Sequence, residues 1–107
     1  MSDYITFLQE VFADFGAITA RKMFGGYGLY YQGLMFALVA DDTLYLKADT
    51  DNVSHFQALQ LPPFQFNKNG KLVTMSYYQA PDDIMDDTEL AAAWARRSFD
   101  AALRAKR

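Results

Sequence analysis

Residues 26–47 read GYGLYYQGLMFALVADDTLYLK, and this stretch decides the fold. It is rich in Tyr, Phe, Val and Leu, which favour strands, and two polar pairs interrupt it. Gln32-Gly33 and Asp41-Asp42 are typical two-residue turns between antiparallel strands. With its flanking residues, from position 18 to position 48, the stretch predicts a meander of three or four strands.

The two turns set a register that sorts the side chains of the meander into two faces, because strand side chains alternate. If Gln32-Gly33 is the turn, Leu29 lies opposite Phe36. One face is small or apolar throughout and is predicted to cover the core: Gly26, Gly28, Tyr30, Met35, Ala37, Val39, Leu44, Leu46 and Ala48. The other face mixes apolar side chains with tyrosines and a lysine and is predicted to point outward: Tyr27, Leu29, Tyr31, Leu34, Phe36, Leu38, Thr43, Tyr45 and Lys47.

The rest of the chain adds three helices and a hairpin. An apolar stripe at helical spacing predicts a helix over residues 3–15, and Val53, Phe56 and Leu59 predict the inward side of a short helix over 51–60. Asn69-Gly70 predicts a hairpin that pairs Phe66 with Val73 and Phe64 with Met75. Asp86 and Glu89 resemble a capping box at the start of a final helix. The predicted fold is α+β in two layers: an antiparallel sheet with helices on one face, in the order α-β(3-4)-α-β2-α.

Composition excludes several classes of protein. The chain has 107 residues, 51% of them hydrophobic and 16% aromatic, so we expect one domain over 1–107. The absence of cysteine excludes disulfides, thiolate metal sites and cysteine nucleophiles. The chain lacks an apolar run long enough for a membrane span, and Met1-Ser2-Asp3-Tyr4 lacks the basic start of a signal peptide, so we expect a cytoplasmic protein. A net charge of -3 argues against a globally basic nucleic-acid binder.

A run of residues around the first glycines resembles a known family. The run is Ala20-Arg21-Lys22-Met23-Phe24-Gly25-Gly26-Tyr27-Gly28-Leu29-Tyr30, followed by Met35-Phe36-Ala37-Leu38-Val39, Leu44-Tyr45-Leu46-Lys47, Met75-Ser76-Tyr77, Ala80-Pro81 and Trp94-Ala95-Arg96-Arg97. In order and spacing it resembles the N-terminal domain of the TfoX/Sxy family, with Arg21, Met23, Phe24, Gly25, Gly26 and Gly28 as motif positions.

This resemblance implies a relationship to bacterial regulators of competence, the state in which cells take up DNA. It also implies a fold like that of the secretion chaperones, and it supplies no catalytic residues. Full-length regulators carry a second, helical C-terminal domain, which we expect this chain to lack.

The residues that often carry chemistry have simpler explanations here. Gly25-Gly26-Tyr27-Gly28 lies between strands, without the helix N-terminus that a phosphate loop needs, so we expect a bend or bulge with close helix packing. His55 is the only histidine, and the acidic clusters lack the spacing of a calcium loop. We therefore expect no catalytic residue, no metal and no cofactor.

Two surfaces remain as candidate sites. The first is an aromatic outer face of the sheet, which is typical of a protein interface: Tyr27, Leu29, Tyr31, Phe36, Leu38, Tyr45 and Lys47. The second is a basic group on the last helix, which fits either a solvated helix end or a phosphate-contacting patch: Arg96, Arg97, Arg104 and Arg107.

The leading interpretation is a non-enzymatic regulatory module that acts through protein contacts, as a homodimer or with another protein. The first alternative is a nucleic-acid-binding regulator that uses the terminal arginines. The second is an enzyme or ligand carrier with a pocket between sheet and helices, where Tyr30, Tyr77 or Arg21 supply polar groups.

Overall fold

The computed structural model of the protein describes residues 2–23 and 25–106. Its elements follow the predicted order: α1 (Asp3–Val11), β1 (Thr19–Met23), β2 (Gly26–Tyr31), β3 (Leu34–Ala40), β4 (Thr43–Lys47), α2 (Val53–Ala58), β5 (Pro63–Lys68), β6 (Lys71–Gln79), the 3₁₀ helix η1 (Asp82–Asp86) and α3 (Thr88–Lys106). The strands form one antiparallel sheet in the order β1-β2-β3-β4-β6-β5. The predicted α+β class and its element order are confirmed.

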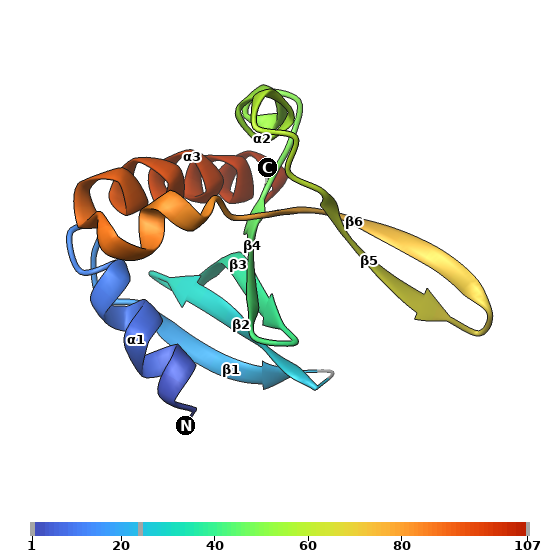
Figure 1. Cartoon of the computed structure of the whole chain (residues 1–107), viewed down its shortest axis with the longest axis horizontal. Helices are drawn as coiled ribbons and strands as arrows, with labels where there is room; N and C mark the ends of the chain where they lie inside the picture. Colours follow the sequence, from blue (N-terminus) through green and yellow to red (C-terminus); the bar gives the residue numbers. More distant parts are fainter. Residues whose placement is uncertain (1, 24, 107) are drawn as a thin grey trace.

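The core lies between the sheet and the helices. α3 packs across β3 and β4, while α1 packs beside η1 and α3 (Figure 1). Phe12 of α1 meets Phe36 of β3 edge to face, with 5.6 Å between ring centroids. Phe99 of α3 is 4% exposed and packs on Tyr31. This layering leaves the other face of the sheet without a helix.

A β-bulge between β2 and β3 changes which side chains face the core. Next to the turn, Tyr31 pairs with Leu34 and Tyr30 with Met35, in the predicted register, but the next residue, Leu29, pairs with Ala37 instead of Phe36. Phe36 is therefore an extra residue in β3, and such an insertion breaks the alternation of this strand, so that Met35 before it and Ala37 after it face opposite sides of the sheet. Phe36 and Ala37 are both fully buried in the core.

The bulge makes the predicted faces wrong along β2 and the first half of β3. Five side chains predicted to point outward belong to the core or pack against it: Leu29, Phe36, Tyr27, Tyr31 and Leu34. The side of the sheet away from the helices carries three residues that were predicted to cover the core: Gly28, Tyr30 and Met35. They lie together, because a Cβ on Gly28 would meet the sulfur of Met35 and the ring of Tyr30. On β4, beyond the bulge, Leu44 and Leu46 are buried in the core as predicted.

The helix ends differ in detail from the prediction. α1 ends at Val11, and the residues up to Phe15 continue as turns. The cap of α3 is Asp87, whose Oδ1 accepts the N–H of Leu90 at 3.0 Å, instead of the predicted Asp86. Leu59, predicted to point inward, follows the end of α2 and is 55% exposed.

A loop between β4 and α2 is fixed to α3 by a polar network. Asn52, 3% exposed, donates from Nδ2 to the carbonyl of Lys47 and accepts the N–H of Asp49. Asp49 in turn accepts two hydrogen bonds from Arg104, at 2.7 and 3.0 Å. These bonds hold the pKa of Asp49 below its usual value. The network ties the last helix to the end of the central strands.

The β5–β6 hairpin projects from the rest of the molecule (Figure 1). Its turn is Asn69-Gly70 as predicted, with φ of 53° and 81°, and Phe66 pairs with Val73. A register shift between Pro63 and Gln65 displaces the pair expected between Phe64 and Met75. Because no helix reaches the hairpin, its apolar side is not buried as predicted, and Phe66 is 36% exposed.

Candidate interaction surface on the open face of the sheet

The side of the sheet that faces away from the helices, here called the open face, carries side chains from every strand. Register and contacts place twelve of them there: Arg21, Met23, Tyr30, Met35, Leu38, Tyr45, Lys47, Phe64, Phe66, Lys68, Met75 and Tyr77. Leu38 pairs with Tyr45, and Lys47 pairs with Tyr77. Aromatic, methionine and basic side chains thus dominate this face.

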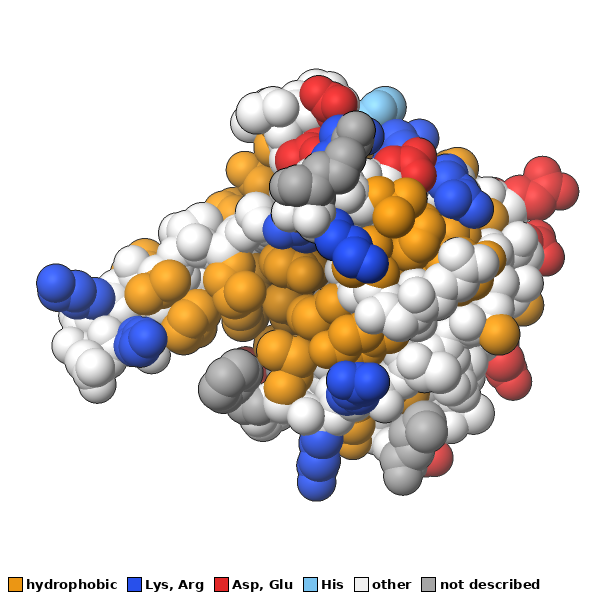
Figure 2. Space-filling view, turned by 180° about the vertical axis from the view of Figure 1, so that it is seen from behind, with side chains coloured by type: hydrophobic (Ala, Val, Ile, Leu, Met, Phe, Trp, Pro, Cys, Tyr) orange, Lys and Arg blue, Asp and Glu red, His pale blue; other side chains and the backbone are white. Residues whose placement is uncertain are grey.

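A groove of about 440 Å³ lies between the projecting hairpin and the strands β1 to β3. Phe64, Phe66 and Met75 form its hairpin side, while Met23 and Leu38 belong to its opposite side. Lys68 is the charged residue of its lining. Figure 2 shows hydrophobic side chains gathered in this hollow, with Lys and Arg side chains around it. The groove is therefore an apolar recess with a basic margin.

The aromatic rings of the open face are packed against neighbours. Tyr45 and Phe64 have ring centroids 4.9 Å apart, and Phe64 stacks on Phe66 at 6.0 Å. The guanidinium of Arg21 lies 4.9 Å from the centre of the Tyr30 ring. These contacts hold the rings in place before any partner arrives, which lowers the entropy lost on binding.

Tyr77 of β6 lies on the open face and is 7% exposed. The ammonium of Lys47 lies 5.1 Å from the centre of its ring and donates to Ser76 Oγ at 2.7 Å. Burial, with a smaller contribution from Tyr30, raises the pKa of Tyr77 to about 12. The phenol therefore stays protonated and able to donate a hydrogen bond throughout the physiological range.

We expect Tyr77 to be the tyrosine that titrates near pH 12 in a spectrophotometric titration. Because the folded state keeps the proton more tightly than the unfolded chain, whose tyrosines titrate near pH 10, the stability contributed by Tyr77 is complete below pH 10 and is lost as the pH rises toward 12. Tyr77→Phe should remove the highest-pH step of the phenolate absorbance. An unchanged titration curve would contradict the burial of this hydroxyl.

The charges of the protein are segregated between its two layers. None of the 13 Asp and Glu residues lies within a strand, whereas five of the 10 Lys and Arg residues do: Arg21, Lys22, Lys47, Lys68 and Lys71. Within residues 2–23 and 25–106, none of these five has a carboxylate within 4.0 Å. The sheet is thus the positive layer of a protein whose net charge is -3.

The predicted arginine patch on α3 has mostly structural contacts. Arg104 pairs with Asp49 and, at 3.3 Å, with Asp51. Arg96 lies 3.8 Å from Asp100. Arg97 lies over the ring of Trp94, and desolvation lowers its pKa. Arg107 lies outside the described residues.

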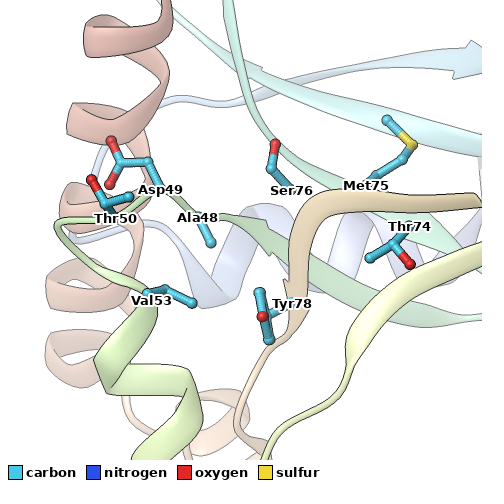
Figure 3. A pocket seen from close by; sticks show the side chains of 8 residues that line it. All are labelled: Ala48, Asp49, Thr50, Val53, Thr74, Met75, Ser76 and Tyr78. Carbon is cyan, nitrogen blue, oxygen red and sulfur yellow. The ribbon is translucent and has the colours of Figure 1, made fainter.

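A second cavity, of about 400 Å³, lies where the hairpin leaves the sheet, between β6 and the loop before α2 (Figure 3). Its polar side chains include Asp49, Ser76 and Tyr78. Asp49 already accepts hydrogen bonds from Arg104, and within the described part of the chain no other basic side chain lines the cavity to act with it. The cavity therefore lacks the paired acid and base that most hydrolytic or proton-transfer chemistry needs.

The structure keeps part of the predicted interaction face and corrects the rest. Leu38, Tyr45 and Lys47 lie on the open face as predicted, but Leu29 and Phe36 are 0% exposed and belong to the core. Sequence reasoning missed the open-face residues Met35, Phe64, Phe66 and Met75. The alternation of Phe64 and Phe66 with polar residues predicted a hairpin with one apolar and one polar side. Only the structure, in which the hairpin projects from the rest of the molecule, shows that the apolar side stays uncovered.

The motif glycines also differ from expectation. Gly26 lies against the backbone of Val39 in a neighbouring strand, and Gly28 lies among methionines of the open face, so neither makes room for a helix. Arg21 and Met23 belong to the open face, whereas Phe24 falls outside the described residues. Tyr30, Tyr77 and Arg21, expected in a pocket between sheet and helices, instead share the open face.

The described residues give no sign of a metal centre or a membrane anchor. Among residues 2–23 and 25–106, no three His, Asp or Glu side chains converge as ligands would. The helices of this same part of the chain are too short or too polar to cross a membrane.

Comparison with known proteins finds a matching family and two named relatives of this chain. Residues 10–102 match the TfoX N-terminal domain. Protein Sxy of Escherichia coli (strain K12) is 32% identical over 100 residues, which cover 92% of this chain and 47% of Sxy. DNA transformation protein TfoX1 of Aliivibrio fischeri (strain ATCC 700601 / ES114) is 32% identical over 79 residues, which cover 70% of this chain and 38% of TfoX1. The chain thus spans less than half the length of these relatives, and it belongs to the TfoX N-terminal domain family.

Proposed function

We propose that this chain is a non-enzymatic regulatory module of the DNA-transformation type that acts in the cytoplasm by binding another protein through the open face. One observation carries the proposal: the apolar groove beside the projecting hairpin, which nothing in the described chain covers. Large apolar recesses with aromatic and methionine side chains are typical of surfaces that bind proteins. Kinship with a DNA transformation protein supplies the regulatory context.

The side chains and the charge of the open face favour binding of another protein over an enzyme active site or a homodimer. Among the described residues, Lys68 is the charged group of the groove and no acid lines it to act with this lysine, which disfavours an enzyme. A homodimer formed through two open faces would bring the unpaired cations of both copies together, and such like-charge contacts cost several kcal/mol. The best occupant is therefore a surface of another chain.

The proposal is tested in Aliivibrio fischeri with a chimera in which this chain replaces the matching segment of TfoX1. We expect the chimera to support DNA transformation and Phe66→Asp to lower the transformation frequency by about tenfold or more, because a carboxylate in the apolar groove costs over 1.4 kcal/mol of binding. The readout is transformants per cell with a marked DNA fragment.

Leu72→Asp is the matched control, since it places the same charge on the same hairpin. Leu72 is 67% exposed and pairs with Asn67 on the side opposite the groove. Both positions are exposed, so each variant should keep its melting temperature within a few degrees. Equal transformation by Phe66→Asp and the unmodified chimera would exclude the open face as the working surface.

A further inference from the structure

The open face carries positive charge that the protein itself does not neutralise. Among residues 2–23 and 25–106, every Lys and Arg outside α3 lies on a strand, and none of them has a carboxylate of these residues within 4.0 Å. On α3, by contrast, Arg96 and Arg104 both pair with aspartates. The chain has 13 acidic residues, so acidic residues are not scarce. The strand cations have no carboxylate partner because all of the acidic residues lie outside the strands. A binding partner is the remaining source of negative charge.

The hairpin tip adds an independent sign of an anionic partner. Lys68 and Lys71 lie directly opposite each other next to the Asn69-Gly70 turn. Like charges in cross-strand pairs destabilise a hairpin. The pair lies on the same side of the hairpin as Phe66, and Lys68 also lines the groove. The repulsion between Lys68 and Lys71 is offset when a carboxylate or phosphate of a partner approaches them.

The groove between these cations is shaped for aliphatic and aromatic side chains. Met23, Leu38 and Met75 line it together with Phe64 and Phe66, and its volume of about 440 Å³ suits a few large side chains. Flexible methionines adapt to the apolar side of a helix, as in other helix-binding grooves. The groove therefore selects a ligand that combines apolar anchors with negative charge.

Stacked bases fit this surface less well than a peptide. Single-stranded nucleic acids bind to aromatic rings whose flat sides are free. Here Phe64 lies between Tyr45 and Phe66, Arg21 covers Tyr30, and Lys47 covers the buried Tyr77. The rings form the floor and wall of a recess instead of a stacking platform.

We propose that the open face binds an acidic amphipathic helix of another protein. Its apolar residues, spaced i, i+3 or i+4, and i+7, enter the groove between β1–β3 and the β5–β6 hairpin. Its Asp and Glu side chains meet the cations on this side of the sheet: Arg21, Lys47, Lys68 and Lys71. This inference rests on the proposed function and specifies the chemistry of the partner.

A selection from random peptides tests the inference directly. The immobilised whole chain is used to select from a displayed library of peptides of about 16 residues, long enough for about four helical turns. We expect the selected sequences to be enriched in Asp and Glu flanking Leu, Ile, Phe or Met at helical spacing. Fluorescence polarisation then measures the affinity of one selected peptide for the wild type and its variants.

Two groove variants and one control separate the contributions. Phe66→Asp should weaken binding by about 30-fold, the effect of losing a central apolar contact. Lys68→Glu with Lys71→Glu should weaken it by about tenfold or more and remove most of its salt dependence. Leu72→Asp, on the other side of the hairpin, should change the affinity by less than about twofold.

Several outcomes would overturn the inference. If the selected peptides are not enriched in Asp and Glu but still bind Phe66→Asp more weakly than the wild type, the acidic helix is refuted and a protein-binding open face remains. The TfoX1 chimera tests the proposed function separately. Tighter binding of single-stranded oligothymidine than of any selected peptide would assign the face to nucleic acid. Sedimentation as a dimer that Phe66→Asp converts to a monomer would assign it to a second copy of the chain.

Discussion

Phe36→Ala is expected to lower the free energy of unfolding by about 3–5 kcal/mol, a large part of the stability of a domain of this size. Phe36 is 0% exposed, and its ring lies 5.6 Å from that of Phe12 and 5.3 Å from that of Phe15. Removing it leaves a cavity between the sheet and the first helix that the surrounding rings cannot fill. Urea unfolding followed by circular dichroism measures the loss.

The neighbouring residue provides the matched control. Met35 lies on the open face and is partly exposed, so Met35→Ala should cost only about 1 kcal/mol. A register without the bulge predicts the opposite ranking, because it places Met35 in the core and Phe36 outside. If Met35→Ala proved the more damaging change, the bulge and the faces derived from it would be wrong.

Gly26→Ala is expected to lower the free energy of unfolding by about 3 kcal/mol or more, because the new methyl group has no room. A Cβ at this position would lie 2.0 Å from the carbonyl oxygen of Val39, whereas carbon and oxygen normally approach no closer than about 3.3 Å. The obstacle is backbone, so no rotamer change relieves the contact. β2 and β3 would have to separate at the margin of the groove.

Gly33→Asn is the control for glycine replacement as such. Gly33 lies in the turn between β2 and β3 with φ of +78°, and a Cβ there would meet nothing within 4 Å. Asn tolerates this left-handed backbone, so the change should cost less than about 1 kcal/mol. Thermal unfolding of both variants compares them, and a mild Gly26→Ala would mean that the strands are less closely spaced than the structure has them.

The comparison with the relatives gives the open face a biological setting. Because the chain matches less than half of Sxy and of TfoX1, each of these proteins has further sequence outside the matched region. The proposed binding of another protein through the open face would link such a longer chain to that protein. The activity of the whole relatives remains a proposal for this chain.

The local elements were predictable because their signals lie within a few residues. The polar pairs Gln32-Gly33 and Asn69-Gly70 form the predicted turns, and the helices occupy the predicted parts of the chain. The element order and short connections then lead to an antiparallel sheet with helices on one side. The segregation of charge also follows from the sequence once the strands are assigned, because five of the Lys and Arg residues and none of the Asp and Glu residues fall on strands.

The sequence by itself therefore determined the class of fold, the order of its elements and the family, because turns, periodicity and motif spacing are local properties. Only the tertiary structure decided which face of β2 and β3 meets the helices. Both Met35 and Phe36 suit a core, and the choice depends on whether one extra residue in β3 lets the Phe36 ring pack between α1 and the sheet. The same packing exposes the opposite face, and the projection of the hairpin turns that face into a groove.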